Sequence, residues 1–86
     1  MGRTEIIAKS TEVFRRVLNQ PTLELYDGLS AAQVPKWDSL THVNLVVALE
    51  ERFQIRFTGK EIRNLNNVGE LLNLIEHKCK VNPIRA

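Results

Sequence analysis

Apolar residues recur at helical spacing in three separate stretches of the chain. These stretches are residues 4–18, 40–53 and 68–79, and each combines an apolar stripe with a more polar strip. Residues 54–57 alternate polar and apolar side chains, but a strand without a partner is not stable. We interpret them as an extended connector whose Ile55 and Phe57 fill the core. The pattern predicts an all-α protein, a small four-helix bundle with three longer helices and one short helix.

Capping signals mark the start of each later helix. Asp38 is a preferred N-cap residue, which places Ser39 at the first helical position. The pairs Thr58–Glu61 and Asn67–Glu70 have the spacing of capping boxes. We expect the first pair to open the short helix and the second pair to open the last one.

The first connection is long and covers residues 19–37. Its apolar residues predict that it packs onto the bundle instead of remaining free, and they are Leu23, Leu25, Tyr26 and Leu29. Ser30 and Gln33 have capping-box spacing, which predicts a brief helical turn that ends before Pro35.

The second helix carries more apolar surface than one packed face requires. Its apolar residues cover more than half of the circumference: Leu40, Val43, Leu45, Val46, Val47, Leu49 and Phe53. Two interpretations remain open at this point. Either the helix is central to the bundle, or Leu40, Val43 and Val47 stay partly exposed and dock partner proteins.

Asp38 and Ser39 mark a helix N-terminus that favours an anion. The Asp38 carboxylate caps the helix, and Ser39 points outward at the N-terminus of that helix. Free N–H groups and the helix dipole at that position favour a phosphate on the serine oxygen. We therefore interpret Ser39 as a covalent attachment point.

Length and composition indicate one small globular domain. The chain has 86 residues, of which 43% are hydrophobic and 26% charged, and we expect residues 1–86 to form a single domain with its core at about 4–79 and a frayed tail at 80–86. The net charge of +2 is dispersed, unlike a nucleic-acid-binding surface. We expect no membrane span, because no apolar run approaches the roughly 20 residues that one needs, and no secretory signal, because the N-terminal residues form no signal-peptide apolar stretch. We expect a cytoplasmic monomer, without an internal disulfide because Cys79 is the only cysteine.

Two possible chemical sites are rejected on their spacing. Asp38, Ser39 and His42 suggest a hydrolytic set, but the carboxylate serves better as the cap, and so short a chain leaves no room for a substrate cleft. His77 and Cys79 lie two residues apart and so face different directions on a helix, which does not suit a metal site with His42. We predict no catalytic residue and no metal site.

The stretch from Asp38 to Phe53 resembles the phosphopantetheine-attachment motif and second helix of acyl carrier proteins. Asp38-Ser39-Leu40 is followed by Val43, by residues 45–51 and by Phe53, and the resemblance extends from about Leu29 to Ile75. It implies a 4′-phosphopantetheine arm on Ser39, beside the Asp38 cap, that carries acyl groups as thioesters. The protein would then be no enzyme itself.

The resemblance also implies partners. They are a phosphopantetheinyl transferase, a ligase or acyltransferase that loads the arm, and synthases or transferases that use the thioester. The candidates for docking them surround the serine: Trp37, Leu40, His42, Val43, Asn44, Val47 and Glu51. For Trp37, a structural role over the loop is the favoured interpretation. Core packing is likewise favoured over sheltering an acyl chain for Leu49, Phe53, Ile62, Leu65 and Ile75.

Charge distinguishes this chain from the carriers of fatty-acid synthesis. Those carriers are acidic along the second helix, whereas Asn44 and Arg52 stand here where acidic residues are common. We therefore predict a specialised carrier for polyketide, mixed peptide or lipid-modification chemistry. Two alternatives are a peptidyl or aminoacyl carrier, which differs in cargo, and a non-carrying interaction module of the same fold.

Overall fold

The computed structural model describes residues 2–81, with side chains as far as Cys79. Its elements are α1 (Arg3–Val17), the 3₁₀ turn η1 (Ala31–Gln33), α2 (Ser39–Phe53), α3 (Gly59–Arg63) and α4 (Val68–Val81). The all-α prediction with three longer helices and one short helix is confirmed, and residues 2–81 contain no strand. The predicted tail is only partly testable, because residues 80 and 81 continue α4 while 82–86 lie outside the described part.

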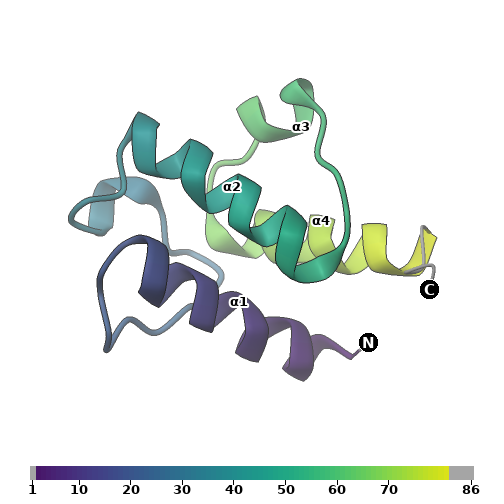
Figure 1. Cartoon of the computed structure of the whole chain (residues 1–86), viewed down its shortest axis with the longest axis horizontal. Helices are drawn as coiled ribbons and strands as arrows, with labels where there is room; N and C mark the ends of the chain where they lie inside the picture. The colour runs from purple at the N-terminus through teal and green to yellow at the C-terminus, as the bar shows by residue number, and fades with distance from the viewer. Residues whose placement is uncertain (1, 82–86) are drawn as a thin grey trace.

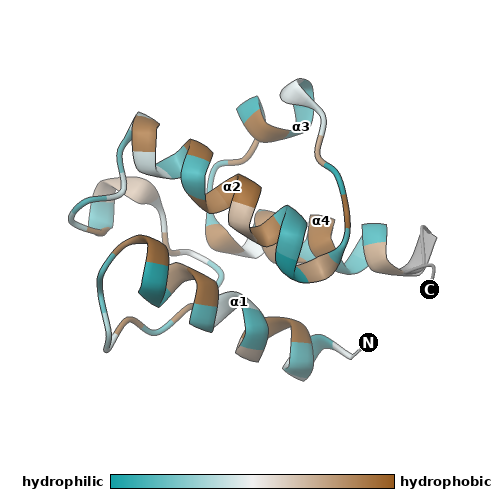
Figure 2. Cartoon of the chain, in the orientation of Figure 1, coloured by the Kyte–Doolittle hydropathy of each residue, from teal (hydrophilic) through white to brown (hydrophobic). Residues whose placement is uncertain are grey.

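Three helices surround the core, and α3 stands to one side (Figure 1). α1 packs against both α2 and α4. α1 and α2 run in opposite directions, with the end of α1 lying below the start of α2 in Figure 1. In Figure 2 the apolar positions of α1 lie mainly on its side toward α2, whereas those of α2 lie on more than one side of that helix. The N-terminal end of α2 is thus held at one end of the bundle.

The core is apolar. It contains side chains from each of the three longer helices, from the first connection and from the connector between α2 and α3. Its fully buried side chains include Ile6, Phe14, Leu45, Leu49, Phe53, Val68 and Ile75. Ile55 and Phe57 are also buried, which confirms that the connector between α2 and α3 fills the core. Burial of such side chains is the main stabilising contribution in a bundle of this size.

The long first connection is fastened to the start of α4. The backbone N–H of Val68 donates to the carbonyl of Leu29 at 2.8 Å, and that of Gly69 donates to the carbonyl of Asp27 at 2.9 Å. A Cβ at position 69 would lie 2.9 Å from the Cβ of Asp27, so this close approach requires glycine. Leu29 is buried as predicted, but Tyr26, which the sequence pattern also placed against the bundle, is 53% exposed.

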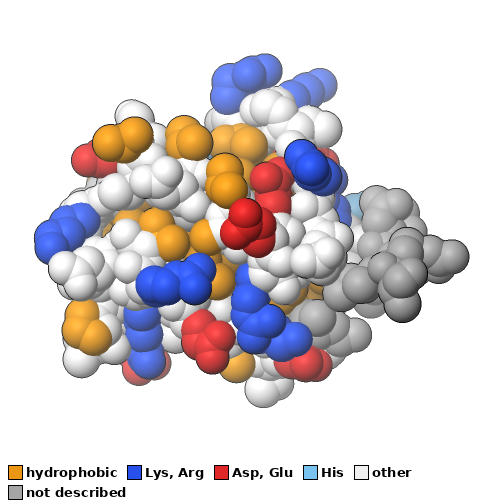
Figure 3. Space-filling view, viewed as in Figure 1, with side chains coloured by type: hydrophobic (Ala, Val, Ile, Leu, Met, Phe, Trp, Pro, Cys, Tyr) orange, Lys and Arg blue, Asp and Glu red, His pale blue; other side chains and the backbone are white. Residues whose placement is uncertain are grey.

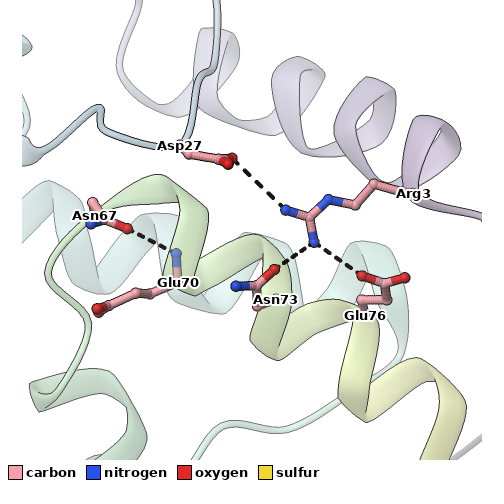
Figure 4. A network of polar contacts seen from close by, with 6 residues as sticks. All are labelled: Arg3, Asp27, Asn67, Glu70, Asn73 and Glu76. Atoms are coloured by element: carbon pink, nitrogen blue, oxygen red, sulfur yellow. Dashed lines mark hydrogen bonds and ion pairs between the residues drawn. The ribbon is translucent and has the colours of Figure 1, made fainter.

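Arg3, at the start of α1, contacts both α4 and the first connection (Figure 4). Its guanidinium donates to Oδ1 of Asn73 at 2.8 Å and pairs with Glu76 at 3.0 Å, both on α4. It also lies 3.8 Å from a carboxylate oxygen of Asp27. One cation therefore connects α1, the loop and α4.

Of the capping boxes predicted from the sequence, the one at α3 is complete, and those at η1 and α4 are formed in part. At η1 the backbone N–H of Ser30 donates to Oε1 of Gln33 at 2.9 Å, and Thr58 and Glu61 cap α3 reciprocally. At α4 the pairing differs by one residue. The N–H of Glu70 donates to Oδ1 of Asn67 at 2.9 Å, whereas the Glu70 carboxylate accepts from the N–H of Asn66 at 2.8 Å.

Candidate functional site

The site is built on the first turn of α2, which begins at Ser39 because Asp38 caps it. Asp38 is extended, and its carboxylate accepts the backbone N–H of Thr41 at 3.0 Å. That hydrogen bond is the main cause of a lowered pKa for Asp38, so the carboxylate is ionised at neutral pH. The predicted cap is confirmed.

Thr41 completes the cap from inside the helix, a role that the pattern of the sequence did not single out. Its hydroxyl accepts the backbone N–H of Asp38 at 2.8 Å and also donates to the carbonyl of Lys36. Lys36 has a φ of 75°, in the left-handed region, where the loop bends before entering the helix. The only sequence signal for this role was a hydroxyl three residues after the N-cap, where Glu or Gln is usual.

Ser39 occupies the first helical position, as predicted, and is exposed. It heads a helix of 15 residues, so the free N–H groups and positive end of the dipole lie beside its hydroxyl. The hydroxyl is thus accessible to an enzyme and lies where an attached anion is favoured.

An open hollow of about 590 Å³ lies beside Ser39. η1, the start of α2 and α3 contribute its walls, which consist of Ala31, Ala32, Trp37, Asp38, Ser39, His42, Ile62 and Arg63. A smaller pocket of about 60 Å³ shares Ala31, Trp37 and His42 and reaches inward to Leu65 and Leu71. The sequence did not indicate that Arg63 would share a wall with Ser39.

Trp37 belongs to the core, which agrees with the structural role that was favoured for it over a contact with partners. Its side chain is only 9% exposed, and its ring meets that of Phe14 edge to face at 5.4 Å. The indole N–H donates to Nδ1 of His42 at 3.1 Å. The loop before Ser39 folds inward, so Trp37 presents little surface to a partner.

His42, one of the candidates for docking partners, is half-buried. Its ring stacks on Trp37 with centroids 6.1 Å apart, and burial lowers the pKa of its imidazole. In the hydrolytic set that the sequence analysis rejected, Asp38 accepts the N–H of Thr41, and Nδ1 of His42 accepts the indole N–H of Trp37. Among residues 2–79, no group of three His, Cys, Asp or Glu side chains could hold a metal ion.

An apolar stripe runs along the outer face of α2 from the serine end. Leu40, Val43 and Val47 are 72%, 58% and 46% exposed, while Leu45, Val46, Leu49 and Phe53 are buried. The expectation that these three residues stay partly exposed is therefore confirmed, and their docking of partner proteins stays a prediction. Asn44 and Glu51 are exposed as well. Figure 3 shows apolar side chains open to solvent on this side of the molecule, with charged groups around them.

Four exposed cations at the entrance to α2, in the connector after α2 and on α3 are not paired within the described part of the chain. Within residues 2–79 no carboxylate lies within 4.0 Å of Lys36, Arg56, Lys60 or Arg63. Two nearby acids are already engaged. Glu61 pairs with Lys78 at 3.0 Å, and Glu50 accepts the backbone N–H of Phe57 at 2.8 Å. The α3 side of the site is consequently basic.

The residues considered for sheltering an acyl chain fall into two groups. Leu49, Phe53 and Ile75 are fully buried in the core. Ile62 and Leu65 are half-buried. Ile62 lines the hollow beside Ser39, and Leu65 lines the smaller pocket behind it.

Within the described residues, no helix is long and apolar enough to cross a membrane.

The sequence and the fold are both similar to known proteins, although no protein-family model matches. The acyl carrier protein of Acidothermus cellulolyticus is 32% identical over 75 residues, which are 87% of this chain and 89% of that protein. The acyl carrier protein of Thermosynechococcus vestitus is 30% identical over 78 residues, 91% of this chain and 96% of its own. The solution structure of the holo acyl carrier protein of Geobacter metallireducens superimposes with a TM-score of 0.84 at 34% identity, covering 93% of this chain and 94% of the other.

Proposed function

This chain belongs to the acyl carrier protein family, and we propose that it carries acyl groups as thioesters on a 4′-phosphopantetheine arm attached to Ser39. The observation that carries the proposal is the position of Ser39. It is exposed at the first position of a 15-residue helix whose start is fixed by Asp38 and Thr41. The site suits the ester, because a phosphate there would meet the positive end of that helix.

The chain is a carrier and not an enzyme, so other proteins supply the chemistry. In the attachment reaction the Ser39 oxygen attacks the phosphorus of coenzyme A that bears pantetheine, and adenosine 3′,5′-bisphosphate leaves. The base that takes the Ser39 proton and the Mg²⁺ that stabilises the charge belong to the transferase. Once loaded, the tether raises the effective concentration of the acyl group at each enzyme that the carrier docks with.

The exposed stripe on α2 is the part of this surface that we propose docks those enzymes. Leu40, Val43 and Val47 follow Ser39 on the outside of the same helix, so a partner that reaches the serine or its arm also covers them. The partners are a phosphopantetheinyl transferase, an acyl-loading ligase or acyltransferase, and synthases or transferases that use the thioester. We propose the cytoplasm as the compartment, because carriers of this family work there.

We further propose a specialised pathway in place of housekeeping fatty-acid synthesis. The support is the charge of the docking side: Asn44 bears no charge, Arg52 is cationic and pairs with Glu12 at 3.6 Å, and α3 adds Lys60 and Arg63. Such a surface repels a basic partner face. An Asn44→Glu, Arg52→Glu variant should therefore bind housekeeping synthases more tightly than the parent does. Equal binding would contradict the assignment.

Mass spectrometry tests the carrier function directly. Incubation with coenzyme A and a broad-specificity transferase should add the mass of one phosphopantetheine to the wild-type chain. Ser39→Ala should gain nothing, whereas the matched control Ser30→Ala should gain the same mass as the wild type. A wild-type chain that stays unmodified with several competent transferases would leave the fold as a non-carrying interaction module.

A further inference from the structure

One cationic side chain stands in the wall of the hollow beside Ser39. It is Arg63, at the end of α3, and it shares that wall with Ser39 and Asp38. Arg63 is exposed and has no carboxylate within 4.0 Å among residues 2–79. The only acidic residue of its own helix is Glu61, which is engaged by Lys78 and by the backbone N–H of Thr58. The guanidinium is therefore available to a ligand.

Any phosphate attached to Ser39 would lie next to a second negative charge. The Asp38 carboxylate precedes the serine and is kept ionised by the N–H of Thr41. A phosphodiester itself retains one negative charge at all pH values near neutrality. Two like charges so close together are unfavourable unless a cation offsets them.

His42 does not supply that cation, although it lines the same hollow. Burial lowers the pKa of its imidazole, so the ring is neutral at neutral pH. Its Nδ1 accepts the indole N–H of Trp37, which leaves the ring hydrogen on Nε2. His42 can thus donate one hydrogen bond into the hollow but contributes no charge.

Resting on the proposed function, we infer that Arg63 is the counter-ion of the phosphodiester on Ser39 and directs the arm across the hollow toward α3. A guanidinium matches the two non-bridging oxygens of a phosphodiester and binds them with two parallel N–H groups. Arg63 acts as a positioning residue: it holds the attached end of the arm, while the thiol end remains free to reach an enzyme.

The test compares holo proteins made from the wild type, Arg63→Gln and Lys60→Gln. Lys60 is the matched control, because it is an exposed cation of the same short helix but does not line the hollow. Mass spectrometry first establishes that each chain is loaded, and circular dichroism establishes that each is folded. The readout is the ³¹P resonance of the phosphodiester, recorded at about 0.02 M and about 0.5 M salt, where ionic screening differs strongly.

In the wild type and in Lys60→Gln, we expect the ³¹P shift to differ from that of free phosphopantetheine and to move toward it as salt is added. In Arg63→Gln it should lie near the free value at both salt concentrations, with slower transverse relaxation. The side-chain Nε–H resonance of Arg63 should also shift between the apo and holo proteins. Identical ³¹P behaviour in all three loaded proteins would overturn the role of Arg63 alone. A wild-type chain that cannot be loaded would overturn the carrier function as well.

Discussion

The indole N–H of Trp37 donates a hydrogen bond of 3.1 Å to Nδ1 of His42, and the two rings stack with centroids 6.1 Å apart. This contact ties the end of the first connection to the first turn of α2, on either side of Ser39. Since Trp37 also packs on Phe14 of α1, the serine end of α2 is fixed to the core through one aromatic side chain.

The stability of the fold should depend on the protonation of His42. Burial lowers its pKa below the ordinary value of 6.5, so the unfolded chain binds a proton more readily than the folded one. The contribution of His42 is therefore complete above pH 6.5 and is lost as the pH falls toward the folded pKa. Urea unfolding at about pH 7.5 and 5.5, on either side of the ordinary histidine pKa, measures the loss.

His42→Asn is the variant for this measurement, because its amide oxygen can accept the indole N–H but does not titrate. The variant should lose less unfolding free energy between the two pH values than the wild type. His77→Asn, which changes an exposed histidine on α4, serves as the control and should behave like the wild type. An unchanged pH dependence in His42→Asn would contradict the prediction.

Trp37 should stabilise the fold by its bulk more than by its hydrogen bond. Trp37→Phe keeps an aromatic ring but leaves Nδ1 of His42 without its donor, and we expect a loss of about 1 kcal/mol. Trp37→Ala empties a site that is only 9% exposed, and the expected loss is about 3–5 kcal/mol. Urea unfolding followed by circular dichroism compares the two variants. Equal losses would mean that the side chain is not packed as described.

Thr41 should matter for the presentation of Ser39 because its hydroxyl links Lys36, Asp38 and the first turn of α2. Thr41→Val removes both hydrogen bonds, and we expect a loss of about 1–2 kcal/mol in unfolding free energy together with slower attachment of the arm. Thr11→Val is the matched control, since its hydroxyl only donates to the Ile7 carbonyl of its own helix. If phosphopantetheine is attached to both variants at the wild-type rate, Thr41 has no part in presenting Ser39.

The exposed stripe should affect partner recognition without affecting stability. Leu40→Ala changes a residue that is 72% exposed, so its unfolding free energy should stay within about 0.5 kcal/mol of the wild type. The same change removes apolar area that a bound transferase covers, and kcat/KM for attachment should fall by about tenfold, on the order of the burial energy of one leucine. Leu45→Ala, at a fully buried position, should instead cost about 2–5 kcal/mol of stability. An attachment rate for Leu40→Ala equal to that of the wild type would argue against docking at this stripe.

Local signals in the sequence determined the helices and the position of the serine. The apolar repeats of residues 4–18 and 68–79 correspond to α1 and α4, and Asp38 caps α2 so that Ser39 is its first residue. These features depend on contacts between residues three or four positions apart, and such contacts are formed by the helix itself. The predicted boundaries consequently agree with the structure to within a residue or two.

Only the tertiary structure decided which side chains face the site. Two apolar residues of α2 differ in burial: Leu45 is fully buried and Val47 is 46% exposed. The reason is that α1 and the other packed elements cover only part of the apolar surface, which extends over more than half of the helix circumference. Trp37 turned inward because Phe14 lies beneath it. Arg63 shares the hollow with Ser39 although it lies 24 positions further along the chain. Such contacts join residues distant in sequence, and helical periodicity carries no information about which distant surfaces meet.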